Sequence, residues 1–147
     1  MVWYRPTSTS KLSDDFEDHK ARGSVNPGVD YPVKIGTPVV AIANGKVTKV
    51  VKNIDGAGGR MVLVQHGTYK ADYLHLSQIH VKAGDTVIGG ETVLGLSGAS
   101  GLGKERGYGP HLHLSIRKGG KHLTGKGNLD YEAFMKKENA KQVKPSE

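Results

Sequence analysis

The segment GPHLHLSI, residues 109–116, places two histidines one residue apart directly after a Gly-Pro pair. In an extended strand alternate side chains project to the same face, so we expect His111 and His113 to lie side by side. Two neighbouring imidazoles suit metal binding, proton transfer or a shared acidic partner. A His-x-His pair is a weak signal by itself, because short motifs often arise by chance. The rest of the chain has to decide its use.

The composition indicates one globular domain. The chain has 147 residues, of which 36% are hydrophobic and 24% are charged, which is typical of a folded domain with its own core. Its apolar runs fall short of the ~20 residues that a membrane-spanning helix needs, so we expect no membrane partner. There is no cysteine, which excludes disulfides and thiolate metal sites. A metal would have to be bound by His, Asp, Glu or an amide.

The charge predicts an anionic partner. The formal net charge is +7 and the isoelectric point is near 9.6, which favours nucleic acid, phospholipid or an acidic polymer such as a bacterial cell wall. Aromatic residues make up only 6% of the chain, and they are not interleaved with a basic patch. Nucleic-acid binding usually needs that pattern, so we expect no nucleic-acid partner.

Short apolar alternating segments separated by glycine turns predict a mostly β fold. We expect two strands within residues 37–51, one each in 58–67, 70–77 and 111–118, and short segments within 80–98. The Asn44-Gly45 pair predicts a hairpin turn between the first two strands. The fold class that follows is an antiparallel β-sandwich or partly open barrel of short strands, with a short C-terminal helix.

Three regions divide the chain. Residues 1–13 form a polar N-terminal arm, which either wraps the sheet through Trp3 and Tyr4 or is loosely ordered. Residues 14–129 form the main domain. Residues 130–147 form a helix and tail, with Asp130 as the helix N-cap, Phe134 docking on the domain and residues 143–147 frayed.

Three separated motifs occur in a characteristic order. They are NPGVDYPVKIGTPVVAIANGKV at residues 26–47, YLHLS at 73–77 and GPHLHLSI at 109–116, with VKAGDTVIGGETVLGLSG following the second. Together they resemble the lysostaphin/LytM-type zinc endopeptidases, which cut peptide cross-links in bacterial peptidoglycan. The resemblance covers roughly residues 14–120. It implies the LytM/lysostaphin-like fold, of the duplicated-hybrid-motif type, and one bound Zn²⁺ ion.

The resemblance also implies roles for four residues. Asp30 and His113 match the family's ligand aspartate and ligand histidine. His111, the first histidine of the His-x-His pair, and His75 in YLHLS match the two histidines that assist catalysis. Carried over to this sequence, they predict a metal-activated water that attacks a peptide carbonyl.

The first ligand position departs from the family pattern, because Asn26 stands where the family has histidine. We expect Asn26 to bind the metal through its amide oxygen, which zinc favours less than imidazole. Asn26 also suits a turn before Pro27 and Gly28. His19, seven residues earlier, is a second candidate for the missing ligand, and a degenerate site with two ligands is a third possibility.

Other residues near the motifs are expected to have lesser roles. His66 falls where the family often has His-Gly at a strand end, and we expect it to be structural. The loop between Gly98 and Pro110 is longer than in compact family members, and Arg106 and Tyr108 on it are expected to border the substrate groove.

The predicted function is therefore a zinc-dependent endopeptidase of bacterial peptidoglycan that acts as a monomer. The N-terminus lacks the apolar segment of a secretory signal, so we expect a phage lysin that reaches the wall by holin-type release or as a virion component. A fragment of a larger cell-wall hydrolase would have the same features. An alternative is a catalytically degenerate domain of the same fold that binds cell wall or a partner protein. A basic nucleic-acid-binding barrel is favoured by the charge alone.

Overall fold

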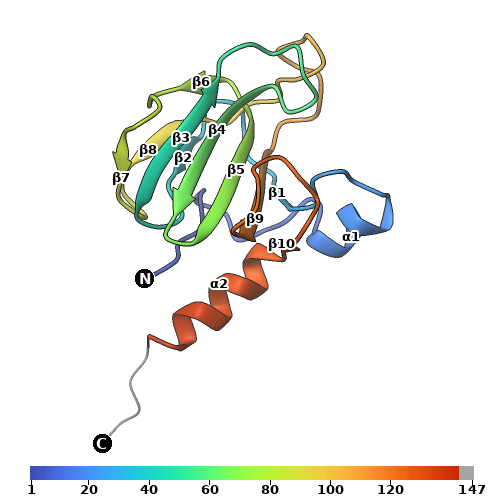
Figure 1. Cartoon of the computed structure of the whole chain (residues 1–147). Helices are drawn as coiled ribbons and strands as arrows, with labels where there is room; N and C mark the ends of the chain where they lie inside the picture. The colour runs from blue at the N-terminus through green and yellow to red at the C-terminus, as the bar shows by residue number, and fades with distance from the viewer. Residues whose placement is uncertain (143–147) are drawn as a thin grey trace, which may run out of the picture.

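The computed structural model describes residues 1–142 and contains two antiparallel sheets and two helices (Figure 1). The elements, in chain order, are α1 (Phe16–Ala21), β1 (Val29–Tyr31), β2 (Pro38–Val40), β3 (Gly45–Val51), β4 (Arg60–His66), β5 (Tyr69–Leu76), β6 (Gln78–Ile79), β7 (Thr86–Val87), β8 (Val93–Leu96), β9 (Leu112–Lys118), β10 (Asn128–Leu129) and α2 (Tyr131–Ala140).

The larger sheet has the strand order β1-β9-β5-β4-β3-β7, and β10 pairs with β9 beside β1. The smaller sheet has the order β2-β8-β6. Within residues 1–142 neither sheet closes into a barrel. The mostly β, antiparallel fold class with a short C-terminal helix is confirmed. No helix in this part of the chain is long and apolar enough to cross a membrane.

Residues of strand β9 alternate between the hydrophobic core and the polar face of the larger sheet. Leu112, Leu114 and Ile116 are fully buried in the hydrophobic core, so the alternate residues of the strand lie on the opposite face. In the strand register Asp30 of β1 lies opposite His113, and Asp72 of β5 lies opposite residue 115. Chemistry-bearing side chains from three adjacent strands are thereby gathered on one face.

The predicted hairpin at Asn44-Gly45 is wrong. Strand β2 pairs with β8 in the smaller sheet, whereas β3 pairs with β4 and β7 in the larger one. The intervening residues 41–43 are buried, and their main chain bonds to other segments: the Ile42 N–H donates to the Tyr73 hydroxyl, and the Ile42 carbonyl accepts from Tyr4. The segment carries the chain from one sheet to the other instead of folding it back.

Helix α2 begins after Asp130, whose side chain accepts from the Ala133 N–H, as expected. The expectation that only the C-terminal region is helical is wrong, because α1 is a helix of 6 residues. The side chains and main-chain N–H groups of Asp15 and Asp18 bond reciprocally in a capping box at its N-terminus, and this stabilises a helix too short to persist by itself. The predicted fraying of residues 143–147 lies outside the described residues.

The N-terminal arm packs against α2 through Trp3. The Trp3 ring is buried and makes edge contacts with Tyr69 and Phe134. The main chain of Trp3 exchanges two hydrogen bonds with the Asn139 amide, 2.8 and 2.7 Å long. The arm is therefore ordered and wraps the domain, one of the two arrangements expected from the sequence.

His66 is a structural residue of the core and gives stability a pH dependence. It is fully buried, and the Tyr73 hydroxyl lies 2.9 Å from its Nε2. Burial lowers the pKa of His66 to about 4, compared with about 6.5 in an unfolded chain. Below about pH 6.5 His66 is therefore protonated in the unfolded chain, whereas in the folded chain it stays neutral down to about pH 4. The free energy of unfolding consequently decreases as the pH falls through this range.

We expect the unfolding free energy of the metal-free protein to fall by about 1.6 kcal/mol between pH 6.5 and pH 5 through His66. Urea unfolding at both pH values, on the wild type and on His66→Gln, measures this contribution. The glutamine variant is expected to show the smaller pH dependence, and the exposed His80→Gln is the matched control. An unchanged pH dependence in His66→Gln would contradict the assignment.

Candidate metal centre

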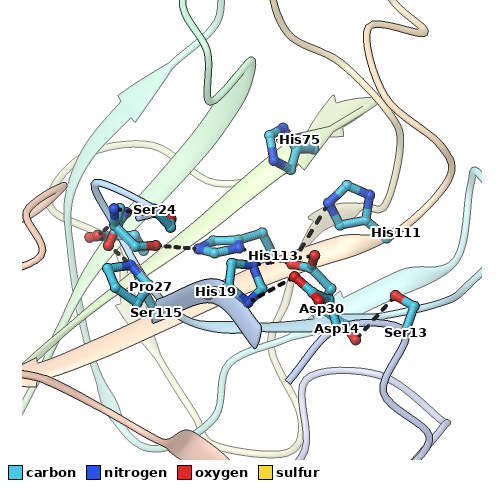
Figure 2. A network of polar contacts seen from close by, with 12 residues as sticks. Ser13, Asp14, His19, Ser24, Pro27, Asp30, His75, His111, His113 and Ser115 are labelled. Carbon is cyan, nitrogen blue, oxygen red and sulfur yellow. Dashed lines mark hydrogen bonds and ion pairs between the residues drawn. The ribbon is translucent and has the colours of Figure 1, made fainter. Parts of the chain in front are cut away.

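A cavity of about 450 Å³ opens on the polar face of the larger sheet. Its lining includes five ionisable side chains drawn from α1, β1, β5 and the β8–β9 region: His19, Asp30, His75, His111 and His113. Figure 2 shows three of the imidazole rings, those of His19, His111 and His113, arranged around the Asp30 carboxylate. The cavity is thus the place where the chemistry-bearing residues converge.

His19, Asp30 and His113 form a compact donor cluster. One ligand atom from each lies within 4.8 Å of the others, and all three residues are buried. The Asp30 carboxylate lies 2.9 Å from Nδ1 of His113 and 3.4 Å from Nε2 of His19. The two distances involve different oxygens of the carboxylate, Oδ1 for His113 and Oδ2 for His19. Ligand atoms around one tetrahedral zinc ion are about 3.4 Å apart, so the three side chains would draw closer together to hold a single ion.

In His19 and His113, the hydrogen bond of one ring nitrogen identifies the other nitrogen as the available ligand atom. Nδ1 of His19 lies 2.8 Å from the Asp15 carbonyl, and Nε2 of His113 lies 3.0 Å from the Asn26 carbonyl. A carbonyl oxygen only accepts, so these two nitrogens are the donors. The remaining nitrogens, Nε2 of His19 and Nδ1 of His113, face the Asp30 carboxylate. If they carried only lone pairs, they would repel its negative charge. A proton or a metal ion between them removes the repulsion, so the residues fit a zinc site with two imidazoles and one carboxylate.

The electrostatics of the cluster keep Asp30 charged. Burial by itself would raise the pKa of the Asp30 carboxyl, but the hydrogen bonds with His113 and His19 outweigh it and hold that pKa well below its usual range. For His19, burial acts to lower the pKa, and the contacts with Asp30 and the Asp15 carbonyl raise it overall. The carboxylate is therefore anionic, as a ligand must be.

Helix α1 positions His19 beside Asp30 and His113. The His19 ring packs edge-on against His113, with ring centroids 4.9 Å apart. Asp14 precedes the helix and lies beside β1, because the Asp30 N–H donates to its carbonyl over 2.9 Å. This contact fixes the start of α1 next to the end of β1, and the first turn of the helix then places His19 over β9.

Figure 2 shows His75 and His111 on the other side of His113 and Asp30 from His19. Their rings are tilted against each other, with centroids 4.8 Å apart. Nδ1 of His75 donates to the Ser100 carbonyl over 2.9 Å, and Nδ1 of His111 donates to the Gly109 carbonyl over 2.7 Å. Nε2 is therefore the basic nitrogen of each ring, as a proton-transfer group needs, and that of His111 lies 3.8 Å from the Asp30 carboxylate.

His75 is held in an unusual environment. Burial, followed by the neighbouring His111, lowers the pKa of His75 to about 4, so the ring is neutral near pH 7. Its φ of 65° lies in the left-handed region that non-glycine residues rarely adopt, and such strain often marks a functional position. The centroid of the Tyr108 ring lies 4.4 Å from that of the His75 ring, and Tyr108 lines the cavity.

The structure does not bring the Asn26 side chain to the donor cluster. Its amide oxygen accepts from Arg117 and Asn128, and its amide nitrogen donates to Asp72. What Asn26 offers the cluster is its main-chain carbonyl, through the hydrogen bond to His113. The amide is occupied by Asp72, Arg117 and Asn128 farther along β9, and the third residue of the donor cluster is His19.

Arg106 also lies elsewhere. It is exposed and does not line the cavity. His19 was the second candidate for the missing ligand. One sequence signal favours it, because Asp15 and Asp18 have the spacing of a capping box and predict a helix that includes His19. The network of Asp72, Arg117 and Asn128 that holds Asn26 has no local sequence signature.

Comparison with known proteins places the chain among peptidases. The model for "Peptidase family M23" matches residues 24–124. The peptidoglycan DD-endopeptidase ShyA of Vibrio cholerae is 35% identical over 146 residues, which covers 95% of this chain and 32% of ShyA. The chain spans about a fifth to a third of the length of the curated relatives it matches.

Solved structures agree with this placement. The catalytic domain of lysostaphin from Staphylococcus simulans superposes with a TM-score of 0.65 and 29% identity, covering 92% of this chain and 90% of that one. A zinc-containing peptidase from Vibrio cholerae gives a TM-score of 0.67 and 31% identity, covering 88% of this chain and 39% of that one.

Proposed function

The chain belongs to peptidase family M23, and on that basis we propose that it is a zinc-dependent endopeptidase that hydrolyses peptide cross-links of bacterial peptidoglycan. The observation that carries the proposal is the donor cluster of His19, Asp30 and His113 at the edge of a cavity that also holds His75 and His111. ShyA and lysostaphin, which are similar to this chain, are described as a peptidoglycan endopeptidase and an antimicrobial peptidase.

The three ligands of the proposed zinc ion are Nε2 of His19, a carboxylate oxygen of Asp30 and Nδ1 of His113. Three protein ligands leave one coordination position for water, which is the arrangement of catalytic zinc sites. A bound zinc ion supplies Lewis-acid activation of water and of the peptide carbonyl. With His19 in this set, the degenerate alternative loses its main support, which was the absence of histidine at position 26.

His75 and His111 supply the proton-transfer groups. In both rings Nε2 is the basic nitrogen, since Nδ1 of each donates to a main-chain carbonyl. A neutral imidazole can take the proton of the attacking water and return it to the departing amine. Because their ring centroids are 4.8 Å apart, both histidines could reach the same peptide bond.

Charge supports the choice of substrate. Peptidoglycan is part of an anionic wall, and a formal net charge of +7 attracts the protein to it. A phage origin, release of the holin type or in a virion, and action as a monomer stay predictions from the sequence.

The test combines metal content with wall hydrolysis. We expect the purified protein to contain close to one zinc ion per chain by mass spectrometry. It should clear a suspension of purified cell walls, lose that activity with a chelator and regain it with added zinc. Clearance that survives complete removal of metal would contradict the proposed chemistry. Bound zinc without release of new amino groups from the wall would favour the degenerate, wall-binding alternative.

A further inference from the structure

We propose that Asn26 is a positioning residue of the metal centre. Its side chain anchors the turn at residues 26–28 to a buried ion pair, and its main-chain carbonyl orients the ring of His113. The inference rests on the proposed zinc site, and it assigns a role to a residue outside the ligand set.

The link from the turn to the metal centre is one hydrogen bond. Nε2 of His113 donates to the Asn26 carbonyl over 3.0 Å, which leaves Nδ1 directed at Asp30. A ligand histidine is commonly held in this way, because the bond on the far nitrogen fixes both the tautomer and the ring orientation. Any shift of the Asn26 carbonyl would therefore turn the His113 ring or free its tautomer.

The Asn26 side chain fixes the position of that carbonyl. Its Oδ1 accepts from Nη2 of Arg117 at 3.0 Å and from Nδ2 of Asn128 at 2.9 Å, and its Nδ2 donates to Oδ2 of Asp72 at 3.2 Å. Asn128 also donates to the carbonyl of Pro27 over 2.8 Å. Both the amide oxygen and the amide nitrogen are engaged, so the turn is attached to β5, β9 and β10 together.

The anchor itself is deeply buried. Asp72 is 0% exposed and Arg117 is 1% exposed, and their side chains are 2.8 Å apart. Among the described residues Nη1 of Arg117 is a buried donor without a partner, which is unfavourable. A buried ion pair of this kind is weak evidence for stability. Its clearer effect is geometric, because it gives Asn26 a fixed point on the sheet.

The turn also packs directly on β9. A Cβ atom at Gly28 would overlap the main-chain carbonyl of Leu114 and come within 2.9 Å of Nε2 of His113. Only glycine allows this close approach without displacing the strand or the ring. The Asn26 amide and the absence of a side chain at Gly28 thus act together in bringing the carbonyl to the imidazole.

A histidine at position 26 would not reproduce these contacts. An imidazole offers one acceptor and one donor nitrogen on a rigid ring, whereas the amide oxygen here accepts two hydrogen bonds. We therefore expect Asn26→His to lose the anchor and not to gain a ligand.

The test compares Asn26→Ala and Asn26→His with Ser115→Ala as a matched control. The Ser115 hydroxyl donates to Asp72 over 3.0 Å and accepts from Arg117 over 3.1 Å. This control removes those two hydrogen bonds but keeps the direct contact between Asp72 and Arg117 and the Asn26 amide. Three quantities are measured: the zinc dissociation constant by chelator competition, urea unfolding of the metal-free protein, and the NMR signal of the His113 Nε2–H in the zinc-loaded protein.

We expect zinc binding to weaken roughly 10-fold or more in Asn26→Ala and in Asn26→His, with the His113 Nε2–H signal broadened by exchange. Ser115→Ala should keep the zinc affinity and the signal. If Asn26→Ala does not fold, Asn26→Gln replaces it, because the longer side chain keeps the amide but displaces the turn.

Each failure has a distinct signature. Wild-type zinc affinity and an unchanged His113 signal in Asn26→Ala would overturn the positioning role and leave the ligand set intact. Tighter zinc binding in Asn26→His would also overturn it, since the side chain would then reach the metal. A wild type that binds no zinc would overturn the proposed metal site and this inference with it.

Discussion

The His19→Ala variant is expected to bind zinc at least about 100-fold more weakly than the wild type and to lose wall hydrolysis. A zinc site with four ligands provides about 10–16 kcal/mol, so one ligand corresponds to roughly 3 kcal/mol, or about 100-fold in affinity. Within the donor cluster, Nε2 of His19 is one of the two imidazole nitrogens that face the Asp30 carboxylate. Chelator competition on purified, folded protein measures the change.

Two further variants make the His19 result specific. His19→Gln keeps a polar side chain on α1, and it is expected to lose zinc in the same way if the alanine variant is unstable. His80→Ala removes an exposed histidine that does not line the cavity, and it should keep zinc and activity. Wild-type zinc affinity in both His19 variants would exclude His19 from the ligand set.

The His111→Ala variant is expected to keep zinc and the fold but to hydrolyse cell walls about a hundred- to ten-thousand-fold more slowly. Loss of a positioned proton-transfer group has an effect of that size. Nε2 of His111 lies 3.8 Å from Asp30 and points into the cavity beside His75, outside the three-residue donor cluster. Release of amino groups from purified walls measures the rate, and mass spectrometry measures the zinc.

Metal content separates this effect from loss of the site. If His111→Ala has lost zinc as well as activity, His111 belongs with the ligands. If the variant cleaves walls at the wild-type rate, His111 has no part in proton transfer. The His80→Ala variant again serves as the matched control, since it removes an exposed imidazole from outside the cavity.

The strand that carries the site was predictable because its signal is local. Alternation along residues 111–118 places His111 and His113 on one face whatever the rest of the fold does, and the structure brings both rings to Asp30. Helix α2 was predictable for the same reason, since Asp130 caps the segment that follows it. In each case neighbouring residues in the sequence carry the whole argument.

The hairpin at Asn44-Gly45 failed because strand pairing is not a local property. The two strands flanking this pair have the right composition, but each finds a partner in a different sheet. Burial of residues 41–43, with hydrogen bonds to Tyr4 and Tyr73, is more favourable than a tight turn. The local preference of two residues for a turn contributes less to the stability of the fold than contacts with segments more than 30 positions away in the sequence.

By itself the sequence determined the mostly β architecture and the family, and it predicted as site residues four side chains that line one cavity: Asp30, His75, His111 and His113. Only the tertiary structure decided what completes the donor cluster. His19 lies on a helix of 6 residues that precedes the matched region of the family. Its place beside Asp30 depends on contacts between α1, β1 and β9. Asn26 stands at the position that the family pattern gives to a ligand, but the buried charges of Asp72 and Arg117 hold its amide away from the cluster.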